Sequence, residues 1–257
     1  MGDMIRYGVV GTGRMGVEHV ENILAMPGAD VTAICDPAPM SIEAGRRAAG
    51  HDVAVFDDHR ELLASGLCDA VVIASPNHTH IELLPDALAT DLHVMIEKPL
   101  CTTVADCERV LAMRDERPAN AITWMAMEYR YMPAAADVLQ LVRDGVVGRP
   151  RMVAIREHRF PFLPKVGNWN RFSANTGGTL VEKTCHFFDL MNLVLDERPN
   201  RVMASGAQDV NHLDETYDGR HPDILDNAYV IVDYPSGARA LLDLCMFADA
   251  TAEQEEM

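Results

Sequence analysis

Residues 4–16 read Met-Ile-Arg-Tyr-Gly-Val-Val-Gly-Thr-Gly-Arg-Met-Gly, and this stretch decides the fold. The apolar, β-branched run from Ile5 to Val10 predicts a strand. Apolar residues recur at helical spacing from Met15 to Met26, which predicts a helix. Three glycines lie between the two elements, so the stretch indicates a strand, a tight turn and a helix.

Each glycine of this turn has a physical role. Gly11 makes the turn, Gly13 lets a pyrophosphate approach the backbone, and Gly16 lets the helix pack closely on the strand. A phosphate would bind at the helix N-terminus, where backbone N–H groups and the helix dipole favour an anion. The turn therefore predicts a dinucleotide site, with Arg14 and Met15 beside the phosphates.

A second predicted strand, Val31 to Cys35, ends at Asp36. A carboxylate at this place can accept hydrogen bonds from the ribose diol of adenosine, and it would repel a 2′-phosphate. The alternative is that Asp36 merely starts a turn with Pro37. Because the strand, the glycine turn and the acid agree, we predict that NAD is the cofactor and that NADP binds less well.

Composition limits the classes of function. The chain has 257 residues, of which 48% are hydrophobic, and a net charge of −17. This charge argues against nucleic acid and anionic membranes as partners. Six cysteines occur without a CxxC pair, which favours reduced thiols. The N-terminal residues show no signal-peptide pattern, so we expect a cytoplasmic protein without a membrane span.

The first half alternates strands with helices, which predicts a doubly wound parallel sheet of the Rossmann type over residues 1–126. In such sheets, ligands bind beyond the carboxyl ends of the strands. The expected strand ends carry polar residues: the glycine turn, Asp36, Ser75 to His80, Glu97 to Pro99, and Met127 to Arg130.

Residues 127–257 predict a second, α+β domain with a mostly antiparallel open sheet. Pro235-Ser236-Gly237 is typical of a hairpin turn between two of its strands. The chain stops soon after the expected strand Arg239 to Phe247, which leaves a sheet edge that more chain would normally cover. We therefore expect this domain to be incomplete at its C-terminus.

Lys98 is the first candidate for catalysis. It follows a predicted buried strand, precedes Pro99, and lies on the ligand side of the sheet. A cation there can hold a substrate hydroxyl and lower its pKa. Glu97 could pair with this cation. The alternative is an ordinary surface lysine in a strand-to-helix loop.

A second candidate cluster lies on a helix expected from about Thr179 to Leu195. Glu182, His186 and Asp189 would share one face of it, and a histidine beside carboxylates can act as a general base near neutral pH. Two alternatives stay open. Thr179 and Glu182 could form a capping box at the helix start. His186 could be a core histidine with its hydrogen bonds satisfied.

Other constellations are weaker. Glu182 with His186, or His78 with His80, could bind a metal, but no third ligand stands at a recognisable spacing, so we predict no metal. No GxSxG motif supports a nucleophilic serine. The loop with Trp169 and Phe172 could line a sugar-binding cleft or pack as core.

The chain resembles the glucose–fructose oxidoreductase, inositol dehydrogenase and MocA family (Gfo/Idh/MocA) over its whole length. The first motif is generic, whereas the later ones are specific in combination. The resemblance rests on Gly11-x-Gly13-x-x-Gly16, Ser75-Pro76-Asn77-x-x-His80, Glu97-Lys98-Pro99, and Gly177-Gly178-x-Leu180-x-Glu182-x-x-x-His186-x-x-Asp189.

This resemblance implies NAD(P)-dependent oxidation of a hydroxyl of a sugar, polyol or related compound. It implies that Lys98 contacts substrate and nicotinamide, that His186 is the acid/base, and that Glu182 assists them. We expect Arg130, Trp169 and Lys183 also to contact substrate. Ser75, Pro76, Asn77, His80 and Glu97 would border the cofactor. The open sheet implies a homodimer or homotetramer.

Three departures and two rival functions accompany this resemblance. The family usually has Asp where Glu182 stands and Gly where Thr184 stands, and its members usually continue through further strands. Lys183 adds a second cation and could mark a subgroup with its own substrate. The rivals are a glycosidase that oxidises its substrate transiently with bound NAD, and a dinucleotide-binding module without turnover.

Overall fold

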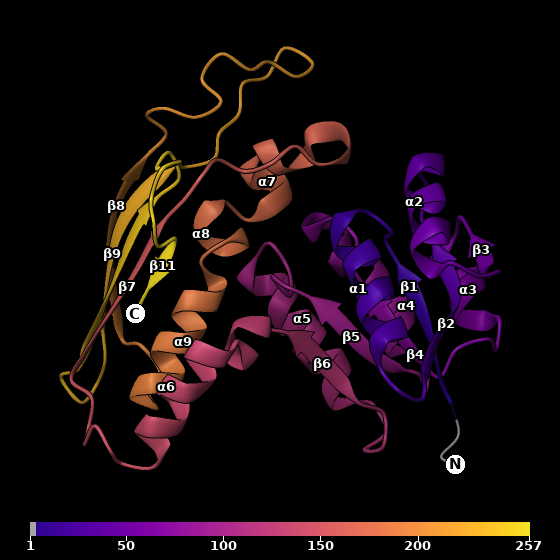
Figure 1. Ribbon diagram of the computed structural model, residues 1–257, viewed down its shortest axis with the longest axis horizontal. Coiled ribbons are helices and arrows are strands. Elements are labelled where there is room, and N and C mark those ends of the chain that lie inside the picture. Colours follow the sequence, from indigo (N-terminus) through magenta and orange to yellow (C-terminus); the bar gives the residue numbers. More distant parts are fainter. Residues whose placement is uncertain (1–3) are drawn as a thin grey trace. The chain divides into compact units, whose positions relative to one another are not determined.

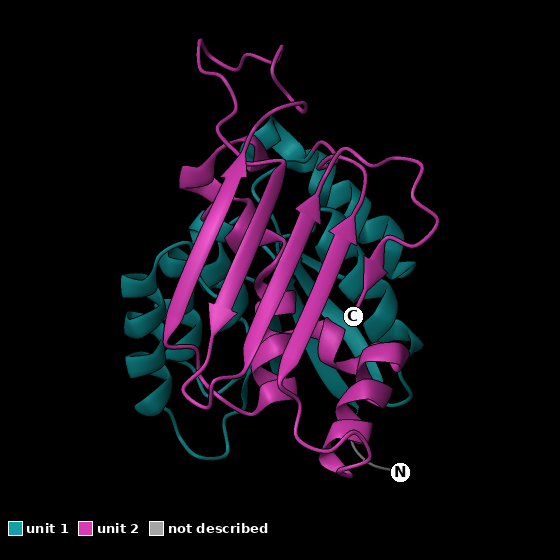
Figure 2. Ribbon diagram, turned by 90° about the vertical axis from the view of Figure 1, so that its left-hand side faces the viewer, with its two compact units in different colours: residues 1–126, 165–169 teal, residues 127–164, 170–257 magenta. Residues whose placement is uncertain are grey.

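The computed structural model describes residues 4–257; residues 1–3, at the start of the predicted first domain, lie outside the described residues. The chain divides into two compact units (Figure 2). Unit 1 comprises residues 1–126 and 165–169, and unit 2 comprises residues 127–164 and 170–257. Each unit has its own sheet.

Unit 1 alternates strands and helices, as the sequence predicts (Figure 1). Its six strands pair in the order β3-β2-β1-β4-β5-β6, and every pairing is parallel. This is the strand order of a dinucleotide-binding Rossmann sheet. Its elements are β1 (Ile5–Val10), α1 (Arg14–Ala25), β2 (Ala29–Cys35), α2 (Pro39–Ala49), β3 (Ala54–Phe56), α3 (His59–Ala64), β4 (Ala70–Ile73), the 3-10 turn η1 (Asn77–Thr79), α4 (His80–Leu88), β5 (His93–Glu97), α5 (Val104–Asp115) and β6 (Thr123–Ala126).

Apolar residues on both faces of this sheet explain why helices cover both. Val9 and Val72 pack in a cluster with residues of α1 and α2. Their chain neighbours Val10 and Val71 pack in a second cluster with residues of α4 and α5. Successive strand residues point to opposite faces, so a continuous apolar run fills two cores.

Unit 2 is built on a five-stranded sheet in the order β11-β7-β10-β9-β8. β10 pairs with β7 in parallel, and the other pairings are antiparallel. Its elements are the 3-10 turn η2 (Glu128–Tyr131), α6 (Pro133–Arg143), β7 (Met152–His158), η3 (Val166–Arg171, which begins in unit 1), α7 (Ser173–Thr176), α8 (Thr179–Glu182), α9 (Cys185–Leu195), β8 (Arg201–Ala207), β9 (Asn227–Asp233), β10 (Arg239–Cys245) and β11 (Glu255–Glu256).

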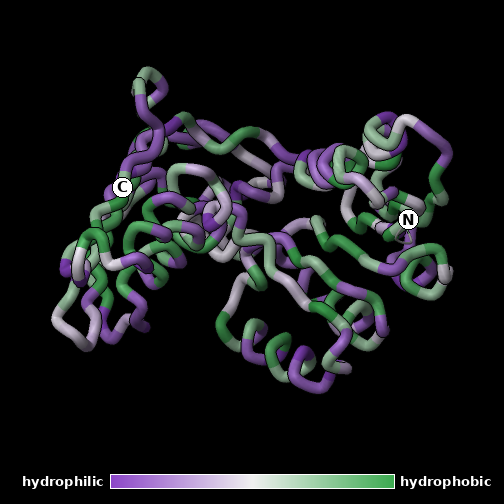
Figure 3. Tube along the Cα trace, turned by 60° about the horizontal axis from the view of Figure 1, so that its bottom comes forward, coloured by the Kyte–Doolittle hydropathy of each residue, from purple (hydrophilic) through white to green (hydrophobic). Residues whose placement is uncertain are grey.

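One face of this second sheet packs against α6 and α9, and its other face is exposed. Val230 and Val232 of β9 are buried against α9, whereas Tyr229 and Ile231 between them are exposed. Figure 2 shows the outward face of the strands toward the viewer, and the tube of Figure 3 alternates hydrophobic and hydrophilic colours within helices and strands. The predicted α/β fold class is therefore confirmed.

The connection between β9 and β10 is the predicted hairpin. Tyr234 N–H donates to Ala238 O at 3.0 Å, and Gly237 has a φ of 83°, a conformation that glycine adopts without strain. Among the described residues, no helix is long and apolar enough to cross a membrane.

Candidate functional site

The glycine turn of unit 1 packs as the sequence predicts. A Cβ on Gly16 would lie 1.8 Å from Gly11 O, so only glycine lets α1 start this close to β1. A Cβ on Gly13 would meet no described atom within 4 Å. The backbone at Gly13 therefore faces open space at the start of α1, which is the arrangement that a pyrophosphate needs.

Asp36 is fixed beside this turn at the end of β2. Its carboxylate accepts hydrogen bonds from the backbone N–H of Thr12 at 2.8 Å and of Ala38 at 2.9 Å. These bonds leave further acceptor positions on the two oxygens for hydroxyl donors. The residues present thus fit NAD, because the acid and the open turn lie at one sheet edge.

The turn after β4 is joined to the turn after β5 through His80. The imidazole is fully buried, with Nδ1 3.0 Å from Pro99 O and Nε2 3.2 Å from Ser75 O. Burial lowers the pKa of His80, and this effect outweighs the nearby backbone carbonyls, which raise it. His80 therefore positions these turns, and the predicted cofactor contacts of Ser75, Pro76, Asn77 and His80 stay predictions.

Glu97 ends β5 and Lys98 follows it, at the same edge of the sheet. Glu97 is buried, and its carboxylate lies 2.7 Å from His19 Nε2 and accepts a bond from the backbone N–H of Lys98. Burial raises the pKa of Glu97, but His19 and the Lys98 charge more than offset it, so the pKa lies below its usual range. Sequence reasoning missed His19, because its helical position carries no signal of a partner in a distant strand.

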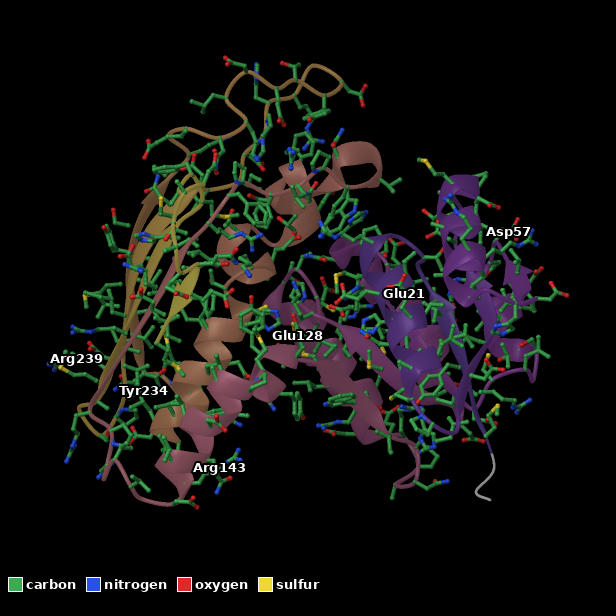
Figure 4. All side chains as sticks on the ribbon, viewed as in Figure 1. Glu21, Asp57, Glu128, Arg143, Tyr234 and Arg239 are labelled. Atoms are coloured by element: carbon green, nitrogen blue, oxygen red, sulfur yellow. The ribbon has the colours of Figure 1, made fainter. Side chains whose placement is uncertain are left out.

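In unit 2, η2 brings three consecutive side chains to α9. Glu128, labelled in Figure 4, lies 3.3 Å from His186 Nε2. The Tyr129 ring stacks on the imidazole of His186 at 4.2 Å, with 7° between the planes. Arg130 binds Asp189 through two hydrogen bonds of 2.6 and 2.5 Å, which raise the pKa of the guanidinium. Arg130, predicted to contact substrate, thus fixes η2 on α9.

The helix expected from Thr179 to Leu195 is interrupted, and this prediction is wrong. α8 ends at Glu182, Thr184 leaves helical geometry with a ψ of 3°, and α9 begins at Cys185. The capping box, which the sequence left open as an alternative, does not form. Thr179 is the first residue of α8, after the cap position Gly178, and its hydroxyl donates to Leu225 O at 2.5 Å. A carbonyl from another segment thus outcompetes the local cap.

The break turns Lys183 inward. Its ammonium lies 2.9 Å from Glu157 Oε1 and donates to the Tyr129 hydroxyl at 2.8 Å. Its neighbours Glu182 and His186 are buried as well. Glu157 shares one face of β7 with the buried residues Val153 and Ile155, and it is fully buried.

Trp169 and Phe172 separate in the structure. Trp169 belongs to the segment that packs with unit 1, where its ring lies 6.2 Å from that of His78, and Lys165 lies over it at 4.4 Å. Phe172 is buried in unit 2 against Tyr217. Of the two loop alternatives, core packing describes Phe172. Within residues 4–257, no group of three His, Cys, Asp or Glu side chains could hold a metal ion.

Comparison with known proteins gives the family. Residues 5–123 match the model described as oxidoreductase family, NAD-binding Rossmann fold, and residues 140–257 match its C-terminal alpha/beta domain. Myo-inositol 2-dehydrogenase of Thermotoga maritima is 30% identical over 93% of this chain and 68% of its own length. Inositol 2-dehydrogenase of Rhizobium meliloti is 30% identical over 79% of this chain and 58% of its own length.

A solved structure shows the same fold. Myo-inositol dehydrogenase from Lactobacillus casei, in complex with NAD(H) and myo-inositol, has a TM-score of 0.81 and 22% identity, covering 97% of this chain and 70% of that one. The two domain matches and the Thermotoga relative together define an NAD-dependent oxidoreductase. The chain belongs to the Gfo/Idh/MocA family of oxidoreductases, as its motifs predict.

Proposed function

We propose that this enzyme oxidises a secondary hydroxyl of a polyol, sugar or related compound to a ketone. NAD, when bound, supplies the hydride acceptor. Lys98 holds and polarises the hydroxyl oxygen, and the imidazole of His186 takes the hydroxyl proton. The observation that carries the proposal is the position of Lys98, which follows β5 at the sheet edge that also carries the glycine turn and Asp36.

Two further features support the site residues. The NAD preference rests on Asp36, and Glu97 with His19 fixes the backbone from which Lys98 extends. Glu182, the buried last residue of α8, stays a proposed assistant to His186. The Thermotoga maritima and Rhizobium meliloti relatives are both named for inositol oxidation, which supports a cyclic polyol as the first substrate to try.

The experiment is NADH formation, followed by absorbance, while inositols, other polyols, sugars and sugar acids are offered with NAD. Reduction by any of them supports the proposal and begins to identify the substrate. If NAD binds in calorimetry but no compound reduces it, dehydrogenation of these classes is contradicted. Release of an aglycone from glycosides without net NADH would then support the glycosidase rival.

We also propose that the chain forms a homodimer or homotetramer through the exposed face of the second sheet, and that it works in the cytoplasm with reduced thiols. All six cysteines are free. The exposed face carries an apolar row flanked by a row of alternating charge, a pattern that a second copy can match. These rows are Met203, Ile231 and Leu241, and Arg201, Asp233 and Arg239; Arg239 is labelled in Figure 4.

A further inference from the structure

Lys183 is buried, and its ammonium lies among two carboxylates and a hydroxyl. Its side chain is only 11% exposed, and its ammonium contacts three acceptors: Glu157 Oε1 at 2.9 Å, the Tyr129 hydroxyl at 2.8 Å and Glu255 Oε1 at 3.7 Å. The first two distances lie within hydrogen-bond range, and the third is an ion pair without a hydrogen bond. A lysine held in this way lacks the freedom of a surface side chain.

Glu157 anchors this lysine. It is fully buried on β7, and the same oxygen that contacts Lys183 lies 3.2 Å from Arg159. A buried carboxylate without cationic partners is strongly unfavourable. Burial raises the pKa of Glu157, and the two cations oppose that effect. The Glu157–Lys183 pair therefore holds the lysine in one position.

Tyr129 connects Lys183 to His186, because its hydroxyl binds the lysine and its ring stacks on the imidazole. Its hydroxyl accepts from Lys183 and donates to Glu255 at 2.6 Å, and burial, with Glu255, raises the pKa of Tyr129 so that the phenol stays protonated. Its ring lies face to face with the imidazole of His186. The edge of Phe187 supports the same ring, with centroids 5.6 Å apart.

The backbone end of Tyr129 is fixed independently. Its neighbour Arg130 binds Asp189 on α9, as described above. The ring is thus held at its hydroxyl by Lys183 and at its backbone by η2, with His186 lying on its face. Rotation of the imidazole about its side-chain bonds would require this platform to move.

We propose that Lys183 is a positioning residue that orients the imidazole of His186 by holding Tyr129 beneath it. The consequence for turnover rests on the proposed function, in which His186 takes the substrate proton. The orientation itself does not depend on that function. This role differs from direct substrate contact, which the sequence predicts for Lys183, and the two roles have different kinetic signatures.

The first readout is the ring-proton NMR signal of His186, assigned with His186→Gln in protein carrying labelled histidine. A stacked aromatic ring shifts the signals of protons on its face. We expect Lys183→Met and Tyr129→Phe to move or broaden this signal in the same way, and the double variant to show no further change. Tyr129→Leu, which removes the ring, should produce the largest shift.

The second readout is steady-state kinetics with the substrate found above. We expect kcat to fall roughly 10- to 100-fold in Lys183→Met, because a misplaced base reacts poorly, while KM changes little. Lys183→Arg keeps the charge and should restore part of kcat. A direct substrate role would instead raise KM and leave the His186 signal unchanged, and that result would overturn the proposal.

Controls separate positioning from loss of fold. Arg149→Met removes the cation of an exposed ion pair in unit 2, with Glu197 at 3.1 Å, and should leave both readouts unchanged. If Lys183→Met does not fold, Glu157→Gln with Lys183→Met removes both charges, and Tyr129→Phe carries the same test. If the wild type oxidises none of the compounds, the proposed function fails, while an unchanged His186 signal in the variants contradicts positioning separately.

Discussion

At the scale of single residues, Lys98 is where the proposed chemistry can be tested most directly. Lys98→Met should lower kcat by about 10²- to 10⁴-fold, because the substrate oxygen loses the cation that polarises it. NAD affinity should stay within a few-fold of the wild type, measured by calorimetry. Arg109→Met, which removes an exposed cation paired with Asp106 in the same unit, is the control. Retained turnover would remove Lys98 from the mechanism.

We expect Asp36 to set the preference of the enzyme for NAD over NADP. Asp36→Ser should lower the ratio of kcat/KM for NAD over NADP by about tenfold or more, because the charge that repels a 2′-phosphate is gone. Asp36→Asn is the matched variant, since its amide oxygen can still accept from Thr12 N–H. If the ratio stays constant in both variants, a residue other than Asp36 contacts the ribose diol and sets the cofactor preference.

Residues at strand ends could be predicted from the sequence, whereas their partners could not. Asp36 and Lys98 follow apolar strands directly, so local pattern places them at the ligand edge. His19 lies 78 positions from Glu97, and Tyr129 lies in a 3-10 turn far from His186 in the chain. Such pairs arise only from tertiary packing, and the spacing of residues in the sequence does not indicate them.

At the scale of elements, the first turn offers a matched pair of glycine substitutions. Gly16→Ala should destabilise the fold by about 3 kcal/mol or more, because its Cβ would overlap Gly11 O. Gly13→Ala should leave thermal unfolding near that of the wild type but weaken NAD binding, because its Cβ enters open space. Equal melting temperatures for the two variants would contradict this packing argument.

The buried ring of His80, which links the turns after β4 and β5, gives a pH prediction. Its pKa is lower in the folded than in the unfolded state, so the unfolded chain binds the proton first as pH falls. The stabilising contribution is therefore present above about pH 6.5 and is lost as pH falls below that value. Denaturant unfolding across this range should show a shallower pH dependence in His80→Asn. His221→Asn, at an exposed position, should keep the wild-type slope.

The broken helix shows where element prediction fails. Residues 179–195 carry helical spacing throughout, and nothing local marks a stop at Thr184. The interruption coincides with the burial of Lys183 against Glu157 and the bond from Thr179 to Leu225 O. These contacts join segments distant in sequence, and their free energy exceeds the small preference of a short segment for continuous helix.

For the whole molecule, periodicity predicted both sheets because each has a simple burial rule. Continuous apolar runs such as Ala70 to Ile73 form a sheet buried on two faces, and alternation in Asn227–Asp233 forms a sheet buried on one. The alternation also places apolar residues outward, since Ile231 and Leu241 point away from the core. A contiguous row of exposed apolar side chains is typical of an interaction surface.

This outward row predicts the oligomeric state. Ile231→Arg should reduce the mass measured by light scattering to that of one chain, because a buried unpaired charge is strongly unfavourable in an interface between copies. NAD affinity should be unchanged, since the neighbours Val230 and Val232 keep the core intact. Leu111→Arg adds the same charge at an exposed apolar position of α5 and is the control. If the wild type already has the mass of one chain, the sheet face does not join copies, and the apolar row needs another explanation.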